Sequence, residues 1–238
     1  MGSAVTSNVV VRHVDRAPRE VLAGFREVDT STAHEAIGRF GFLGAHIRPV
    51  QQGARIAGSA VTVLVHPGDN IMIHAAIALL EPGDVLVVAS TAPSANALFG
   101  ELMATSAQAR GGVGLITDGA VRDVDAIRQL GFPVWSQHIG CQGPVKTTPG
   151  WVNIPVVLGE QAVHPGDVVC ADDTGVVVVP RRGAAEALAA ARRRMEAEAV
   201  LRERFAAGEL SVDIAGLDAK LAELGVVYVD RLEDLPAG

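Results

Sequence analysis

Residues 57–135 alternate short Val-rich runs with helical patterns, and this alternation constrains the fold more than any other feature of the sequence. The run Val85–Ala89 is continuously apolar, which is typical of a parallel strand buried on both faces. Comparable runs lie at 57–65, 112–117 and 132–135, and helical patterns lie at 71–80, from 99 to 110, and after 123 as far as 130. Strands that alternate with helices indicate an α/β fold. We expect a layered α/β/α sandwich with a central mixed sheet and a long C-terminal helix.

The flanking segments predict one domain over residues 1–238, because no linker-like stretch divides the chain. Residues 1–15 resemble an N-terminal arm, and helical patterns begin near Pro18 and at Ser31 or Thr32. After residue 140 the sequence pattern changes, and it predicts short strands at 145–147, 152–158, 168–171 and 176–179. A long helix at 183–207 and a tail element at 217–229 follow. A long exposed helix usually packs on something, so we expect 183–238 to lie at a subunit interface.

Composition and charge exclude several classes of function. The net charge is −7, and an acidic chain without a basic patch argues against a nucleic-acid partner. No apolar run approaches the roughly 20 residues of a membrane-spanning helix, and no signal-peptide pattern is present. Residues 1–6 match the loose N-myristoylation pattern, for which a flexible start is the alternative that we favour. Cys141 and Cys170 are expected to be buried, reduced thiols of a cytoplasmic protein.

The densest cluster of functional residue types is Asp118-Gly119-Ala120-Val121-Arg122-Asp123-Val124-Asp125, at the predicted end of a buried strand. Ligands of open α/β sheets bind at this edge. Arg122 can grip a carboxylate with two N–H groups, and Asp123 can hold Mg²⁺ or Mn²⁺, a cation type that needs only one or two protein carboxylates. The alternative is an acid-rich helix N-terminus that complements the helix dipole, with Arg122 in a surface ion pair.

The segment 99–105 is a second candidate, because it also lies at a predicted strand-to-helix junction. Gly100 lets the backbone approach a ligand closely. The amides of Glu101, Leu102 and Met103 could bind a carboxylate, and a buried Glu101 could move a proton. The alternative is that Glu101 is simply an acid in the first turn of a helix, where acids are favoured.

Three further features have simpler interpretations. His74 lies in an apolar helical pattern, which favours a core histidine. Asp172 and Asp173 are interpreted as part of a tight turn. Three Pro-Gly-Asp triplets, at 67–69, 82–84 and 165–167, predict turns with Pro at the second position and Gly at the third.

Longer motifs lie in order over almost the whole chain. They are Thr32-x-His34-Glu35-Ala36, Gly68-Asp69-Asn70-x-Met72-Ile73-His74, Phe99-Gly100-Glu101-Leu102-x-Ala104-Thr105-Ser106, Asp118-x-x-Val121-Arg122-Asp123-Val124, Gly131-Phe132-Pro133-Val134-Trp135-Ser136, Ala171-Asp172-Asp173-x-Gly175-Val176-Val177-Val178-Val179-Pro180 and Ala206-Ala207-Gly208-Glu209-Leu210. Together they resemble class II pyruvate aldolases, specifically the 4-hydroxy-4-methyl-2-oxoglutarate / 4-carboxy-4-hydroxy-2-oxoadipate aldolases. Those enzymes are related to the regulator of ribonuclease E activity.

The resemblance implies a site. Asp123 would anchor the metal, partly through water, and Arg122 would bind the keto acid and the enolate that forms from it. The amides of the 101–103 turn, with Gly100 before them, would hold the pyruvyl carboxylate. Glu101, 21 positions before Arg122, would position the water that protonates the enolate. Family members commonly have Asp at that position, which is one methylene shorter.

The resemblance also implies partners. The cofactor would be Mg²⁺ or Mn²⁺, the substrate a small 2-oxo acid, and oxaloacetate decarboxylation a second activity. The assembly would be a trimer or a dimer of trimers, in which Glu35 and Glu198 reach the site across a subunit interface. Two alternatives stay open: a related 2-oxo acid decarboxylase or hydrolase, and a non-catalytic regulator resembling the ribonuclease E inhibitor. The extension 206–229 favours the aldolase branch.

Overall fold

The computed structural model describes residues 7–235, so the six residues that match the myristoylation pattern lie outside the described part. Contacts within the chain divide it into two units, residues 1–192 and residues 193–238. None of the helices between residues 7 and 235 is both long and apolar enough to cross a membrane. The expectation of one domain stays a prediction.

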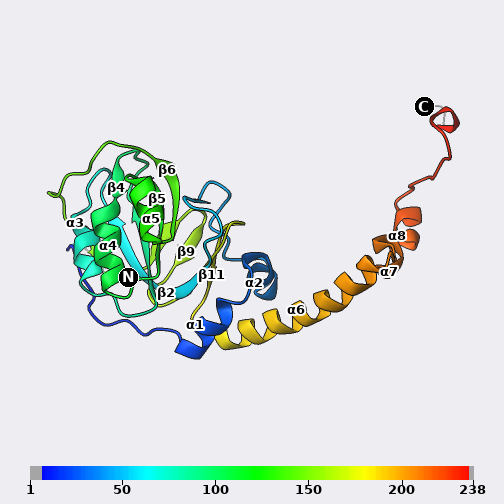
Figure 1. Cartoon of the computed structure of the whole chain (residues 1–238), viewed down its shortest axis with the longest axis horizontal. Coiled ribbons are helices and arrows are strands. Elements are labelled where there is room, and N and C mark those ends of the chain that lie inside the picture. Colours follow the sequence, from blue (N-terminus) through cyan, green and yellow to red (C-terminus); the bar gives the residue numbers. More distant parts are fainter. Residues whose placement is uncertain (1–6, 236–238) are drawn as a thin grey trace, which may run out of the picture. The chain divides into compact units, whose positions relative to one another are not determined.

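A mixed sheet of nine strands lies at the centre of the first unit (Figure 1). Its path runs β1-β6-β5-β3-β2-β10-β11, with β4 paired to β5 and β7 paired to β2. The four pairs β2–β3, β3–β5, β4–β5 and β5–β6 are parallel, and the other pairs are antiparallel. The strands are β1 Arg48–Pro49, β2 Ile56–Val65, β3 Asp84–Ser90, β4 Ala97–Phe99, β5 Gly114–Val121, β6 Val134–Ile139, β7 Trp151–Val152, β10 Val168–Ala171 and β11 Val176–Val179. The predicted α/β class with a central mixed sheet is confirmed.

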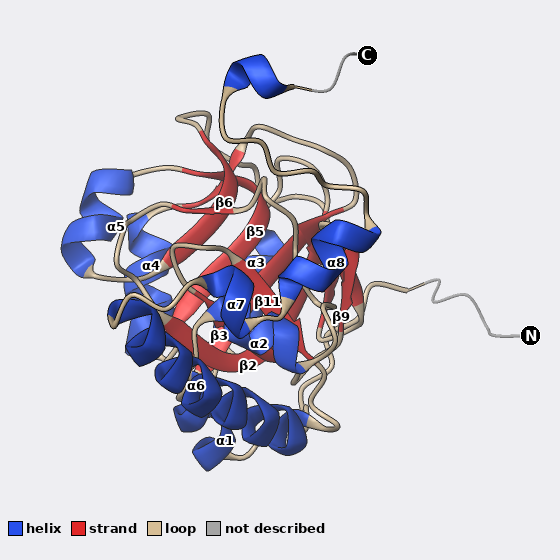
Figure 2. Ribbon diagram, turned by 90° about the vertical axis from the view of Figure 1, so that its right-hand side faces the viewer, coloured by secondary structure: helices blue, strands red, loops and turns tan. Residues whose placement is uncertain are grey.

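Three helices that connect the parallel strands cover one face of the sheet (Figure 2). They are α3 Ile71–Ile77, α4 Glu101–Ala109 and α5 Val124–Leu130. Successive strand residues point to opposite faces, so alternate residues of β2, such as Val61 and Val63, join Ile73 and Ile127 in one apolar cluster. This packing fixes the first turn of each helix next to the end of a strand, which is where the candidate site residues lie.

The opposite face holds a second apolar cluster, which includes Trp135 and Leu43. The hairpin of β8 Val156–Leu158 and β9 Gln161–Val163 contributes to it, together with a loop that contains Ile47. The remaining helices of this unit are α1 Arg19–Phe25, α2 Thr30–Ala36 and the beginning of α6 Ala184–Ala206. Leu188 of α6 packs so closely against Gly24 of α1 that any side chain at position 24 would collide with Leu188.

The structure corrects several boundaries. The strand expected at 112–117 continues to Val121, with a register shift after Thr117. Residues 97–99 form a strand, β4, where a loop and a helix start were expected. A strand was expected at 145–147, but there Val145 makes only an isolated bridge with Asp69. Three-residue strands such as β4 carry too little periodicity to be recognised from the sequence.

Cys170 is buried as predicted, whereas Cys141 is exposed, so the prediction of two buried thiols is wrong for Cys141.

The three Pro-Gly-Asp triplets do form turns, and each glycine has a positive φ. Each aspartate is also buried and binds groups outside its turn. Asp84 accepts hydrogen bonds from Arg16, and Asp167 accepts one from the Arg181 amide. Asp69 accepts from the amides of residues 147 and 148. The aspartates of these turns therefore also connect segments that are distant in the sequence through hydrogen bonds.

The second unit contains the end of α6, the short helices α7 Ser211–Ile214 and α8 Leu217–Glu223, and a 3₁₀ turn at Leu232–Asp234. The long helix confirms the prediction at 183–207 to within a residue at each end. None of the residues 193–235 is buried in the single chain. Leu224, Tyr228 and Leu232 are among the large apolar side chains that it exposes.

Candidate functional site

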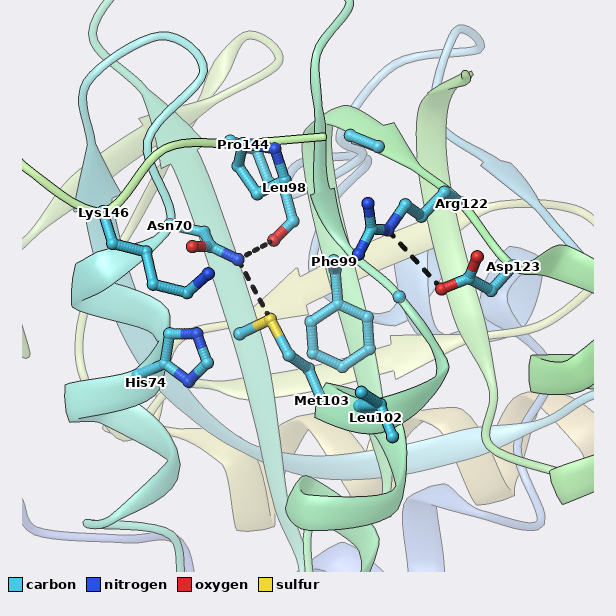
Figure 3. A pocket seen from close by; sticks show the side chains of 12 residues that line it. Asn70, His74, Leu98, Phe99, Leu102, Met103, Arg122, Asp123, Pro144 and Lys146 are labelled. Atoms are coloured by element: carbon cyan, nitrogen blue, oxygen red, sulfur yellow. Dashed lines mark hydrogen bonds and ion pairs between the residues drawn. The ribbon is translucent and has the colours of Figure 1, made fainter. Parts of the chain in front are cut away.

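A cavity of about 180 Å³ brings both candidate segments together (Figure 3). Gly100, Leu102 and Met103 come from the start of α4, and Arg122 and Asp123 come from the end of β5. The other residues that line it are Asn70, His74, Ala97, Leu98, Phe99, Pro144 and Lys146. Pockets for drug-sized ligands usually exceed about 300 Å³, so this cavity suits a small metabolite.

Strand pairing explains why Glu101 and Asp123 meet, although they lie 22 positions apart in the chain. The short strand β4 pairs in parallel with the end of β5, so that Phe99 lies opposite Val121. The Arg122 amide donates to the Phe99 carbonyl at 3.0 Å. Helix α4 is the crossover between the two strands, so its first turn starts beside the residue at which β5 ends. Both segments therefore present their functional groups at the carboxyl ends of neighbouring parallel strands.

Asp123 has a backbone that few side chains adopt, with φ of 56°. It stands at the N-cap position of α5, yet its carboxylate makes no capping bond to that helix. The Oδ2 atom instead accepts from the Glu101 amide at 3.3 Å and lies 3.5 Å from Arg122 Nε. Such backbone strain often accompanies a functional position. The ion pair of the simpler interpretation is present, and Asp125 is an acid in the first turn of α5, so both parts of that interpretation are compatible with the structure.

Gly100 is required for this arrangement. A Cβ atom at that position would lie 2.5 Å from Asp123 Oδ2 and 3.2 Å from the Arg122 side chain. Any other residue would therefore push the acid and the guanidinium away from the start of α4. Gly143 has the same relation to Arg122, because a Cβ there would lie 2.9 Å from a guanidinium nitrogen.

The three amides at the start of α4 differ in availability. The Glu101 amide donates to Asp123, and the Met103 amide donates to the Gly100 carbonyl at 3.1 Å. No hydrogen bond described within residues 7–235 uses the Leu102 amide. The Glu101 carboxylate accepts from Thr105 Oγ1 at 2.8 Å and is not among the groups that line the cavity. Its role in proton transfer stays a prediction.

Glu35 and Glu198 lie outside the cavity of the single chain. Glu35, on α2, pairs with Arg39 and lines a separate hollow with His34 and Phe42. Glu198 belongs to the second unit and pairs with Arg194 one helical turn before it. Their proposed contribution to the site of another subunit stays a prediction.

Three lining residues were missed as site candidates: Asn70, His74 and Lys146. The prediction of a core histidine is wrong, because His74 is exposed and faces the cavity. Burial of part of the ring, and then the charge of Lys146, lower the pKa of His74. Asn70 and His74 are four residues apart, which places them on one helix face. That spacing was a usable signal, whereas Lys146 lies in a loop and had none.

Asp118 does not join the cavity. Its carboxylate accepts from the Ser90 amide, where β3 ends. Burial raises the pKa of Asp118 to about 6, although hydrogen bonds to amides act in the opposite direction. The acid-rich motif around Arg122 therefore divides into a ligand-facing pair, Arg122 and Asp123, and a structural acid.

Comparisons with known proteins place the chain in a family. Residues 30–178 match the family model described as RraA-like, Aldolase/RraA, and the chain belongs to this family. A protein of Halalkalibacterium halodurans named "Putative 4-hydroxy-4-methyl-2-oxoglutarate aldolase" is 29% identical over 191 residues, which cover 80% of this chain and 90% of that protein. A protein of Ectopseudomonas mendocina with the same name is 34% identical over 129 residues, covering 52% of this chain and 76% of that protein.

Solved structures agree with this assignment. The structure of RraAS2 from Streptomyces coelicolor, described as an unusual member of the RNase ES inhibitor RraA protein family, has a TM-score of 0.72. It is 28% identical in sequence, and the match covers 79% of this chain and all of that one. The family thus includes relatives named as aldolases and relatives named as inhibitors of RNA processing.

Proposed function

We propose that this protein is a divalent-metal-dependent aldolase. It cleaves 4-hydroxy-4-methyl-2-oxoglutarate or 4-carboxy-4-hydroxy-2-oxoadipate to pyruvate plus pyruvate or oxaloacetate. The observation that carries the proposal is the adjacency of the Arg122 guanidinium and the Asp123 carboxylate above Gly100, on the wall of one small cavity. The names of the two relatives support this choice of substrate.

Arg122 has the central role in this reaction. As the carbon–carbon bond breaks, the hydroxyl group at C4 loses its proton to a base and becomes the keto group of the released fragment. The electron pair of the broken bond moves into the pyruvyl part, where negative charge develops on the keto oxygen. A guanidinium that is already in place stabilises that charge without reorganisation of solvent. The Arg122 side chain is 43% exposed, so its N–H groups can reach a substrate. The Leu102 amide is available for the pyruvyl carboxylate.

The donor set at Asp123 fits Mg²⁺ or Mn²⁺. Asp123 is the only carboxylate among the described residues that line the cavity, so the protein would offer one carboxylate. Mg²⁺ commonly binds through one or two carboxylates and keeps its other positions for water and substrate. Asp123 is 46% exposed, and the missing side chain of Gly100 leaves its carboxylate accessible. The bound cation would supply Lewis-acid chemistry to the keto acid.

The same site would decarboxylate oxaloacetate, because loss of CO₂ leaves the same pyruvate enolate. We also propose a homo-oligomer, a trimer or a dimer of trimers. Leu102 at the rim of the cavity is 80% exposed, and the second unit buries no residue of its own. Both observations support a neighbouring subunit whose surface would cover these exposed side chains. Glu35 and Glu198 would then reach the site of a neighbouring subunit.

The direct test is pyruvate release from 4-hydroxy-4-methyl-2-oxoglutarate, coupled to lactate dehydrogenase, with and without added Mg²⁺ or Mn²⁺. We expect turnover that needs the metal and disappears with EDTA. Turnover that survives EDTA would contradict the metal mechanism. Cleavage or decarboxylation of other 2-oxo acids alone would make the protein a related decarboxylase or hydrolase.

A non-catalytic, protein-binding role is the second candidate, and the match to RraAS2 supports it. It predicts binding to ribonuclease E and no metal-dependent turnover of any 2-oxo acid. Binding measured by surface plasmon resonance, with inhibition of RNA cleavage as a second readout, separates this role from the aldolase.

A further inference from the structure

A hollow of about 460 Å³ has no part in the proposed reaction. It lies where the end of α2, strand β9, the end of β11 and the start of α6 come together, and we call it the α2–α6 hollow. None of the residues that line the Arg122 cavity lines this hollow. Its volume falls within the range of about 300–1,000 Å³ that is usual for small-molecule sites. The α2–α6 hollow is therefore large enough to hold a ligand of its own.

Apolar side chains form most of the wall of the α2–α6 hollow. They come from all four elements and include Ile37, Ala162, Val179 and Ala187. Phe40 joins them, and this residue is 71% exposed. An aromatic ring that is open to solvent offers its face and its edge to another ring. The hollow therefore suits a ligand with an apolar, aromatic body.

The backbone after α2 accounts for the exposure of Phe40. Gly38 and Gly41 both have φ of 79°, and Arg39 has φ of 68°. The Gly41 carbonyl accepts from the Val178 amide at 2.8 Å, and a Cβ atom at Gly41 would collide with the Val178 carbonyl. Gly41 thus lies directly against the edge of β11. Because a positive φ at a residue such as Arg39 often accompanies a functional position, the outward placement of Phe40 is a built feature of this loop.

Arg182 supplies a positive charge that the protein leaves uncompensated. Arg182 is exposed, and none of the hydrogen bonds and ion pairs described within residues 7–235 involves its side chain. The neighbouring Arg181, in contrast, pairs with Asp15 at 3.2 Å. An unpaired guanidinium can bind a carboxylate through two parallel N–H groups. Arg182 therefore favours an anionic group on the ligand.

The carboxylate that lines the α2–α6 hollow does not cancel this charge. Asp167 is 6% exposed, and its oxygens accept from the His164 amide at 2.9 Å and the Arg181 amide at 2.8 Å. The His164 ring lies 3.6 Å from Asp167 on the same side. Asp167 is thus occupied by groups of the protein, whereas the Arg182 guanidinium is open. One guanidinium matches a monocarboxylate better than a phosphate ester, which carries nearly two negative charges at pH 7.

We propose that the α2–α6 hollow binds a small aromatic monocarboxylate. Its ring packs on Phe40 and the apolar wall, and Arg182 binds its carboxylate. The inference is independent of the proposed function, because it uses no residue of the Arg122 cavity. A ligand in this place contacts the end of α2 and the start of α6 together, so it stabilises the folded protein.

Isothermal titration calorimetry of the full-length protein with 2-naphthoate tests this site. The neutral analogue 2-naphthamide has the same rings without the charge. We expect saturable binding and an affinity for the acid about 10- to 100-fold higher than for the amide, as for a charge-assisted pair of hydrogen bonds. Equal affinities, or binding that does not saturate, would overturn the inference. The same holds for complete absence of binding, which is the result expected if a second copy of the chain covers the hollow.

Two substitutions separate the charge from the apolar contact. Arg182→Met should remove the preference for the acid, and Phe40→Ala should weaken both ligands about 3- to 10-fold. Arg181→Met is the matched control, because that guanidinium is already paired with Asp15, and it should leave the preference unchanged. Equal losses in the two arginine variants would reduce the effect to general attraction by positive charge and refute the site.

A carboxylate can also enter the Arg122 cavity, so the titration is repeated with Arg122→Ala in EDTA. Binding of 2-naphthoate should persist there, and the ligand should raise Tm in this variant but not in Arg182→Met. Loss of binding in Arg122→Ala would place the ligand in the other cavity and refute the inference. Tighter binding of 2-naphthyl phosphate than of 2-naphthoate would refute the choice of a monocarboxylate.

Discussion

The two ends of the Arg122 cavity are built in different ways. The Arg122–Asp123 end comes from adjacent residues, half exposed and paired with each other at the end of one strand. The Lys146 end joins helix α3 to a loop more than 70 residues later, and a buried aspartate holds the two together. Arg122 and Asp123 balance each other in charge at the first end until a divalent cation binds, and a bound cation would make this end positive where negative charge develops during the proposed reaction. At the second end the backbone next to Lys146 is held by hydrogen bonds to Asp69, whereas the Lys146 side chain is exposed.

The largest effect is expected at the Arg122–Asp123 end. Asp123→Ala should abolish metal-dependent turnover, and Arg122→Ala should lose at least about 2 kcal/mol of transition-state stabilisation, or roughly 30-fold in kcat/KM. Both side chains are about half exposed, so Arg122→Ala should change thermal unfolding little. Asp123→Ala should cost about 1 kcal/mol of stability, because Ala tolerates the positive φ of residue 123 less well than Asp does. Steady-state kinetics with Mg²⁺ checks this. Near-normal turnover in both variants would contradict the assignment of the site to Arg122 and Asp123.

The next largest effect is expected at Asp69, which accepts hydrogen bonds from the amides of residues 147 and 148. Asp69→Asn replaces one carboxylate oxygen with an NH₂ group, which must face either the Ile71 amide or the amides of residues 147 and 148. The substitution should lower the free energy of unfolding by about 1–3 kcal/mol. Unfolding in urea measures this loss, and an unchanged free energy of unfolding would contradict the structural role of Asp69.

The pH dependence of that variant has a definite sign. Burial raises the pKa of Asp69, but hydrogen bonds from residues 71, 147 and 148 lower it further than burial raises it. A carboxyl with a depressed folded-state pKa stabilises the protein above its unfolded value of about 3.9, and this contribution disappears as the pH falls. The difference between Asp69→Asn and the unsubstituted protein should therefore be largest near neutral pH and shrink below about pH 4.

Asp118, on the strand that leads to Arg122, should behave in the opposite way. Its folded-state pKa is raised to about 6, so ionisation destabilises the folded protein as the pH rises from about 4 to 6. Asp118→Asn, in which the side-chain oxygen can still accept from Ser90, should be more stable than the unsubstituted protein at pH 7–8. The two should be equally stable near pH 4. Urea unfolding at several pH values measures this, and a constant difference would contradict the assignment.

The smallest effect on stability is expected for Glu198→Gln. The pair with Arg194 is exposed and spans one helical turn, so its loss should change the free energy of unfolding by less than about 0.5 kcal/mol. If Glu198 serves a neighbouring subunit, kcat/KM should nevertheless fall in the oligomer. Unchanged kinetics, or a monomer in light scattering, would remove Glu198 from the site.

The sequence by itself determined the elements with strong local signals. Strands 168–171 and 176–179, the long helix from 184 to 206 and the α/β class follow from unbroken apolar runs and helical periodicity, which need no knowledge of distant residues. Arg122 and Asp123 were recognisable because both stand in one short motif. Gly100 was recognisable for a similar reason, since a glycine at a strand-to-helix junction permits close approach of the backbone.

Only the tertiary structure decided what these residues meet. Strand β4 is too short to show periodicity, yet its pairing with β5 sets Gly100 against Asp123. His74 was expected in the core because its helix is apolar, but the outward face of that helix borders a cavity. Lys146 carries no pattern at all, and Asp69 had been interpreted as a turn residue. Their positions depend on hydrogen bonds between segments far apart in the chain, and local periodicity contains no information about such contacts.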